Sequence, residues 1–127
     1  MSRVGDTAPA APAGDVDTYA ELYRRMLLIR GFEDRVQSLF LRGEVYGTTH
    51  LYSGQEAVAV GFASSLGPED RVACTYRGHG HLLAMGTDPE GLLAELLGRE
   101  TGVNGGRAGS MNVVDPEHGV LGCYGIV

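Results

Sequence analysis

The stretch "RVACTYRGHGHLLAMG", residues 71–86, decides the fold class. Its beginning, "RVACTY", is a short run of mostly apolar residues that predicts a buried strand. The segment "RGHGHLLAMG" then predicts a loop that runs into a helical turn. Arg77 would therefore follow the end of a strand, which is where α/β proteins bind their ligands.

Helical patterns precede this stretch. Thr18 and Glu21 have the spacing of a capping box, and the helix that they predict stops at Gly43. Ser53 and Glu56 form a second capping box. The segment behind it, "AVAVGFASSL", has so little polar surface that we expect its helix to be buried on most sides. Apolar residues recur at helical intervals along the first helix and predict its buried face: Leu22, Met26, Ile29, Val36 and Phe40.

Another helix and a set of glycine loops follow. In "DPEGLLAELLG", Asp88 is the expected N-cap, Pro89 occupies the first helical position and a glycine ends the helix. Beyond it, "SMNVV" is a strand candidate between loops. This order of elements predicts an α/β protein whose sheet is only begun in this chain. We expect residues 1–17, rich in Ala, Pro, Gly and Asp, to form a flexible arm, and residues 18–127 to form the folded part.

Composition excludes several classes of function. The chain has 127 residues and a formal net charge of -6, without the cluster of Lys and Arg that nucleic-acid binding needs. No apolar run is long enough to span a membrane, and the amino terminus does not resemble a signal peptide. We therefore expect a cytoplasmic protein without nucleic-acid or membrane partners. Cys74 and Cys123 form no Cys-x-x-Cys pair, so buried free thiols are expected rather than a disulfide framework.

The histidines raise the question of a metal site. His79 and His81 form a His-x-His pair, and His50 or His118 is a possible third zinc ligand. Leu83, however, stands where a His-x-His-x-Asp hydrolase has its acid. Histidines that hydrogen-bond the backbone of loops are the commoner explanation, and we predict no metal ligands in this chain.

A phosphate site is the second possibility. Arg77 lies in a glycine-bearing loop and can offer two parallel N–H donors to a phosphate, although a single arginine is more often a structural salt-bridge partner than a ligand. The sequence contains no Walker motif. In "RGHGHL" a leucine takes the place of the last glycine of the dinucleotide-binding motif, which argues against a Rossmann site.

Several segments together resemble one known family. These are "LLIRGFEDRV", "THLYSGQEAVAVG", "TYRGHGHLLAMG", "LLAELLGRETGVNGGRAGSMN" and "GVLGCYGIV". In this order and spacing they are similar to the amino-terminal part of the alpha subunit of thiamine-diphosphate-dependent 2-oxo acid dehydrogenases. The pyruvate and acetoin types are more similar than the branched-chain type. The resemblance covers residues 18–127 and implies part of a thiamine-diphosphate-binding fold, a parallel sheet flanked by helices.

The resemblance implies roles for individual residues. The histidine that matches His50 faces the reacting carbons and relays a proton. The residues that match Tyr76 and Arg77 contact the cofactor, with the arginine on its diphosphate. The backbone groups that match Gly125 and Val127 contact the aminopyrimidine.

Other positions are implied to lie around the site. His79 is expected to hold the loop that contacts the cofactor. Asn112 stands where the family commonly has histidine, and Tyr124 stands where the acetoin type has asparagine. Both positions are expected near the substrate end of the cofactor, so the substrate can differ from the usual one. Ser53 and Glu56 are better explained as a helix cap than as catalytic residues.

The resemblance also implies cofactors and partners. Thiamine diphosphate and Mg²⁺ are the family's cofactors, but the Gly-Asp-Gly segment that helps to hold the metal is not found in this sequence. We therefore expect the metal ligands and the rest of the alpha subunit on a separate chain, so that the subunit is split. A beta subunit completes the assembly, with two copies of each chain.

These expectations leave four accounts of the chain open. The favoured one is decarboxylation of a 2-oxo acid, or cleavage of an acyloin, with transfer of the acyl unit to a lipoyl domain. The first alternative is transfer of an acyl or two-carbon unit from a 2-oxo acid or a ketose to an acyl carrier protein. The others are a noncatalytic scaffold subunit and a truncated, inactive chain. Retention of His50, Tyr76 and Arg77 together favours the enzyme.

Overall fold

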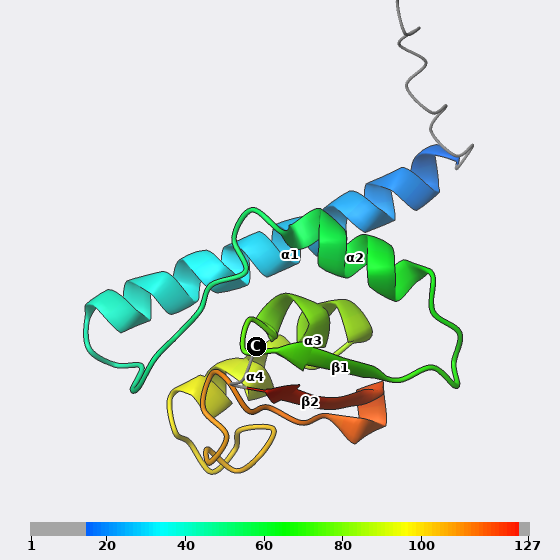
Figure 1. Cartoon of the computed structure of the whole chain (residues 1–127). Coiled ribbons are helices and arrows are strands. Elements are labelled where there is room, and N and C mark those ends of the chain that lie inside the picture. The colour runs from blue at the N-terminus through cyan, green and yellow to red at the C-terminus, as the bar shows by residue number, and fades with distance from the viewer. Residues whose placement is uncertain (1–14, 125–127) are drawn as a thin grey trace, which may run out of the picture.

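The structure is a computed structural model that describes residues 15–124. Helices α1 and α2 run beside each other over α3, and α3 packs on a small sheet (Figure 1). No helix in the described part is long and apolar enough to cross a membrane. In chain order the elements are α1 (Val16–Leu41), α2 (Glu56–Ser64), β1 (Val72–Thr75), α3 (His79–Met85), α4 (Pro89–Leu96), the 3-10 turn η1 (Pro116–His118) and β2 (Val120–Tyr124).

The sheet consists of β1 and β2, which pair in parallel. Val72 and Val120 are buried, whereas Leu121 and Tyr124 are 52% and 55% exposed. Parallel strands in α/β proteins are normally covered on both faces by helices. One face of this sheet is open among the described residues, so the chain holds part of an α/β fold, as the sequence predicted.

Helix α1 begins before the predicted capping box. Asp15 is its N-cap and accepts a hydrogen bond of 2.7 Å from the backbone N–H of Thr18. Glu21 instead pairs with Arg24, so the box predicted from Thr18 and Glu21 is wrong. A cap at residue 15 places the first turn inside the segment predicted as an arm. The arm's first fourteen residues lie outside the described part.

The buried face of α1 differs in part from the predicted one. Ile29 and Val36 are buried, as predicted, but Phe40 is 44% exposed and Leu39 is buried in its place. A charged residue, Glu33, also lies on this face and is completely buried. The helix packs against α2 and α3, and their positions decide which residues are covered.

Helix α2 differs from the prediction in its cap and its burial. Gln55 is the N-cap, so Ser53 does not cap the helix. The carboxylate of Glu56 does reach back, but to the N–H of Gly54, at 3.0 Å. Val58 and Phe62 are 63% and 51% exposed, so the expectation that most sides are buried is wrong. Only the side toward α1 and α3 is covered within this part of the fold.

The strand and helix predictions for the middle of the chain are confirmed. β1 falls within "RVACTY", although it is covered on one face only. In α4, Asp88 accepts a hydrogen bond of 2.7 Å from the N–H of Gly91, and Pro89 is the first helical residue. The strand predicted for "SMNVV" is wrong, because these residues form a turn and irregular chain. The second strand, β2, was not predicted.

A buried carboxylate organises the glycine-rich loop after α4. Glu95 is completely buried, and its two oxygens accept backbone N–H groups. One oxygen lies 2.7 and 2.8 Å from the nitrogens of Asn104 and Gly106, and the other lies 2.6 and 3.3 Å from those of Ala108 and Gly109. A carboxylate that accepts several N–H groups can stabilise a loop that has no ladder hydrogen bonds of its own.

Candidate active site

The fold brings together the three residues that the resemblance selects. His50 lies in the loop between α1 and α2, and Tyr76 and Arg77 follow β1. The ring centroids of His50 and Tyr76 are 4.2 Å apart, and the two ring planes make an angle of 50°. The guanidinium carbon of Arg77 lies 6.0 Å from the Tyr76 ring centre, and Arg77 donates a hydrogen bond to the carbonyl of Leu51. The arginine thus ties the two loops together.

Two buried polar atoms in this loop have no partner in the described part of the protein. They are Oγ1 of Thr49 and Nδ1 of His50, which are neighbours in the sequence. A buried polar atom that lacks a hydrogen bond costs about 1–3 kcal/mol. Such atoms are expected where a further group completes the site.

The loop after β1 enters α3 through two tightly packed glycines. A Cβ on Gly78 would lie 2.1 Å from Sγ of Cys123, and a Cβ on Gly80 would lie 2.2 Å from the ring of Tyr52. Real carbon atoms do not approach so closely, so a side chain at either position would displace the loop. The "RGHGH" sequence therefore fixes how near Tyr76 and Arg77 lie to the core.

His79 belongs to a buried chain of hydrogen bonds. Its Nδ1 lies 3.1 Å from the carboxylate of Glu33 on α1, and its Nε2 lies 2.9 Å from the hydroxyl of Ser110. The order acid, histidine, serine is that of a hydrolytic triad. All three side chains are at most 5% exposed, however, so the serine is not open to a substrate. We interpret these hydrogen bonds as a structural link between α1, α3 and the glycine-rich loop.

Sequence reasoning did not single out Glu33 or Ser110. Glu33 lies four residues after Ile29 and three before Val36, on the apolar face of α1. A carboxylate on such a face needs a buried partner, and this signal was available in the sequence. Ser110 carried no comparable signal, because its partner comes from a distant part of the chain.

The remaining histidines, His81 and His118, contact residues outside the cluster of His50, Tyr76 and Arg77. Nε2 of His81 lies 3.3 Å from the hydroxyl of Tyr52, and burial lowers the pKa of His81. His118 is 2.8 Å from the carboxylate of Asp115 in the turn before β2. Across residues 15–124, no three His, Cys, Asp or Glu side chains are placed to hold a metal ion.

The other predicted site residues lie toward the end of the chain. Asn112 is exposed, and Tyr124 is 55% exposed at the end of β2. Within the described range, no hydrogen bond or ring contact joins either one to His50, Tyr76 or Arg77. Gly125 and Val127 lie outside the described residues, so their predicted contacts stay predictions.

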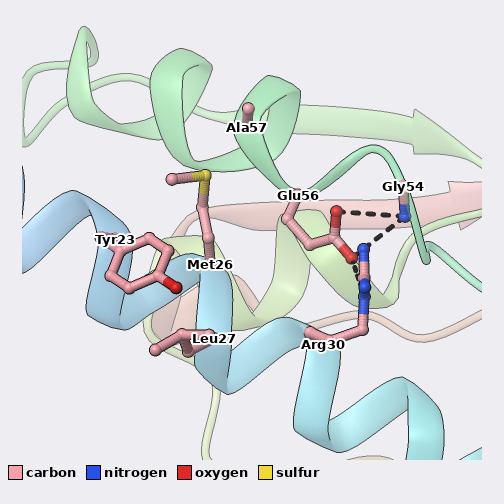
Figure 2. A pocket seen from close by; sticks show the side chains of 7 residues that line it. All are labelled: Tyr23, Met26, Leu27, Arg30, Gly54, Glu56 and Ala57. Atoms are coloured by element: carbon pink, nitrogen blue, oxygen red, sulfur yellow. Dashed lines mark hydrogen bonds and ion pairs between the residues drawn. The ribbon is translucent and has the colours of Figure 1, made fainter.

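Glu56 lies in a separate groove between α1 and α2. Figure 2 shows its carboxylate between Arg30 of α1 and the N–H of Gly54. The Nε of Arg30 lies 2.6 Å from this carboxylate, and the hydrogen bond from Arg30 holds the pKa of Glu56 below its usual value. These contacts account for Glu56 as a structural residue that joins two helices.

Comparison with known proteins identifies the family. The dehydrogenase E1 component family matches residues 24–127. The chain is 49% identical over 106 residues to the alpha subunit of acetoin:2,6-dichlorophenolindophenol oxidoreductase of Bacillus subtilis, which is 84% of this chain and 32% of that protein. It is 48% identical over 120 residues to the alpha subunit of the pyruvate dehydrogenase E1 component of Zymomonas mobilis, 94% of this chain and 34% of that protein.

The alpha subunit of the acetoin oxidoreductase of Cupriavidus necator is 40% identical over 126 residues, 99% of this chain and 38% of that protein. These matches place the chain among the alpha subunits of dehydrogenase E1 components. The chain belongs to the dehydrogenase E1 component family, as its sequence motifs indicated. It spans about a third of the length of the curated relatives that it matches.

Proposed function

We propose that this chain provides part of the active site of a thiamine-diphosphate-dependent enzyme that decarboxylates a 2-oxo acid and transfers the acyl unit to a lipoyl carrier. Cleavage of an acyloin is the related reaction that the acetoin-type relatives suggest. The observation that carries the proposal is the cluster of His50, Tyr76 and Arg77, drawn from two separate loops.

The residues of the cluster fit the cofactor. The orphaned atoms of Thr49 and His50 call for a polar group against their loop. Arg77 uses one N–H group on the carbonyl of Leu51, and a guanidinium has four further N–H donors for a diphosphate. Tyr76 adds an aromatic face and a hydroxyl. A cationic and aromatic pair beside a histidine suits a ligand that carries both a diphosphate and aromatic rings.

Each residue has a definite task in this proposal. Bound thiamine diphosphate supplies the carbanion and the electron sink for the reaction. Arg77 and Tyr76 bind and orient it, and His50 holds or moves a proton through a ring nitrogen. His79, fixed between Glu33 and Ser110, keeps the loop that carries Arg77 in place.

The rest of the site must come from other parts of the assembly. The open face of the sheet, where Leu121 and Tyr124 are exposed, needs further α/β structure to cover it. We propose that the rest of the alpha subunit covers it and supplies the Mg²⁺ ligands. A beta subunit would complete the enzyme, with two copies of each chain. The cytoplasmic location expected from the sequence stays a prediction.

Two alternatives lead to different results. Transfer to an acyl carrier protein is motivated by Asn112, which stands where the family commonly has histidine. A noncatalytic scaffold subunit would keep the fold without needing a proton-transferring histidine.

Replacement of His50 tests the proposal. In the purified assembly, His50→Ala should lower turnover of the 2-oxo acid by about 10²- to 10⁴-fold, because a general acid–base group contributes a factor of this size. Binding of thiamine diphosphate, measured by calorimetry, should persist. His118→Ala is the matched control, because His118 contacts Asp115 in another region, and it should keep normal turnover. Normal turnover in the His50 variant would support the scaffold instead.

A further inference from the structure

The two cysteines of the chain lie opposite each other in the sheet. Cys74 of β1 and Cys123 of β2 are partners in the parallel register, and their sulfur atoms are 3.3 Å apart. Both are free thiols. They are separated by 49 positions in the sequence, so the pairing of the strands alone brings them together.

The backbone around the pair suits a disulfide. Neighbouring strands lie about 4.7–4.9 Å apart, and the Cα atoms of a disulfide are usually about 4.4–6.8 Å apart. Two cysteines in register can therefore be joined without moving the strands far. Gly78 packs directly on the sulfurs, since a Cβ there would lie 2.1 Å from Sγ of Cys123 and 3.2 Å from Sγ of Cys74. The lack of a side chain at this position leaves room for both thiols.

The two thiols differ in access and in acidity. Cys74 is partly exposed, whereas Cys123 is 2% exposed. A hydrogen bond from Cys123 lowers the pKa of Cys74, and the same contact together with burial raises the pKa of Cys123. The more accessible sulfur is thus also the one that ionises first. This is the arrangement of an attacking thiol and a resolving thiol.

We propose that Cys74 and Cys123 are a modification site at which a reversible disulfide forms between β1 and β2. The oxidant is a low-molecular-weight disulfide such as oxidised glutathione. The Cys74 thiolate attacks one of its sulfurs, which forms a mixed disulfide and releases one glutathione thiolate. Cys123 then loses its proton and attacks the Cys74 sulfur, which releases the second. Two electrons pass from the protein thiols to the oxidant, and two protons pass to the released thiolates, which gives two glutathione molecules.

The position of the pair links it to the candidate active site. Cys74 precedes Tyr76 by two residues, and Gly78, where an added Cβ would meet both sulfurs, directly follows Arg77. The sulfur atoms are 3.3 Å apart as free thiols and about 2.05 Å apart in a disulfide. Forming the bond therefore shifts the end of β1, from which the loop with Tyr76 and Arg77 begins. The modification itself does not depend on the proposed function, because it can be measured without any activity.

The test is a redox titration of the native protein in its assembly. Samples are equilibrated at increasing ratios of oxidised to reduced glutathione, quenched with acid, alkylated and analysed by peptide mass spectrometry. Both thiols should lose alkylation together, a peptide linking Cys74 to Cys123 should appear, and dithiothreitol should reverse the change. In denaturant, half-oxidation of the two thiols should require an at least about tenfold higher ratio of oxidised to reduced glutathione. The reason is that an unfolded chain no longer holds the thiols together.

Single variants separate the two thiols. In Cys123→Ser, Cys74 should accumulate as a mixed disulfide with glutathione, because no resolving thiol remains. In Cys74→Ser, the buried Cys123 should stay reduced. The proposal is overturned if both thiols of the wild-type protein remain alkylatable at excess oxidised glutathione, if the linked peptide joins two separate molecules, or if Cys74 of the Cys123→Ser variant does not react.

Discussion

The imidazole Nδ1 of His79 lies 3.1 Å from the carboxylate of Glu33, and neither side chain is exposed. A carboxylate can only accept, so Nδ1 carries the proton of this hydrogen bond. The pair joins the middle of α1 to the first residue of α3, directly after the loop that carries Tyr76 and Arg77. The orientation of the candidate active-site loop therefore depends on a helix that is distant in the sequence.

Weakening this pair should loosen the loop. Glu33→Gln keeps the size of the side chain but replaces the charged acceptor, so we expect the assembly to lose about 1–3 kcal/mol of stability. Hydrogen exchange should also become faster at residues 76–79. Glu44→Gln, which alters an exposed pair with Arg42, is the control and should change stability by less than about 1 kcal/mol. Equal effects of the two variants would contradict a specific role for Glu33.

Replacing the arginine of the cluster should weaken cofactor binding. Arg77→Lys removes the planar arrangement of donors, so we expect the concentration of thiamine diphosphate for half-maximal activity to rise about tenfold or more. The maximal rate should fall less. Arg71→Lys is the matched control, because Arg71 stands just before the other end of β1 and donates to the carbonyls of Pro68 and Asp70. An unchanged cofactor titration for Arg77→Lys would refute the assignment.

The contact between Glu56 and Arg30 should make the free energy of unfolding depend on pH in the acid range. The hydrogen bond from Arg30 lowers the pKa of Glu56 in the folded state. The stabilisation is thus fully present above the unfolded value, about pH 4.3, and is lost as the pH falls through the lower folded pKa. Glu56→Gln should therefore be less stable than wild type at neutral pH, and the difference should shrink in acid. Urea unfolding between about pH 3 and pH 7 measures this. A difference that is constant with pH would exclude the ion pair as its source.

The two departures from the family should select the substrate. Asn112 and Tyr124 are both exposed in the described part, so they are available to line a substrate site. The double variant Asn112→His, Tyr124→Asn should shift preference toward simple 2-oxo acids, because a changed hydroxyl or amide alters which substrates leave polar groups unpaired. Relative rates over a panel of acyl donors measure the shift, with Glu117→Gln in the exposed η1 turn as control. Identical relative rates would count against a selecting role.

Local sequence signals determined the elements whose causes lie within a few residues. The cap at Asp88 with Pro89 fixed α4, and the run before Tyr76 fixed β1. The order of motifs also indicated the family, and the resemblance to that family singled out His50, Tyr76 and Arg77 as candidate site residues. These signals are readable because a cap, a turn or a short apolar run acts on its immediate neighbours.

Tertiary structure alone decided the features that join distant segments. Strand β2 formed because a parallel strand can pair only after the chain has returned to β1. Glu33 of α1 and Ser110 of the glycine-rich loop both hydrogen-bond to His79, although the three residues are far apart in the sequence. Their pairing depends on how α1 and the glycine-rich loop pack against α3. Burial and partner choice are properties of that packing, and a single sequence specifies them only through the whole fold.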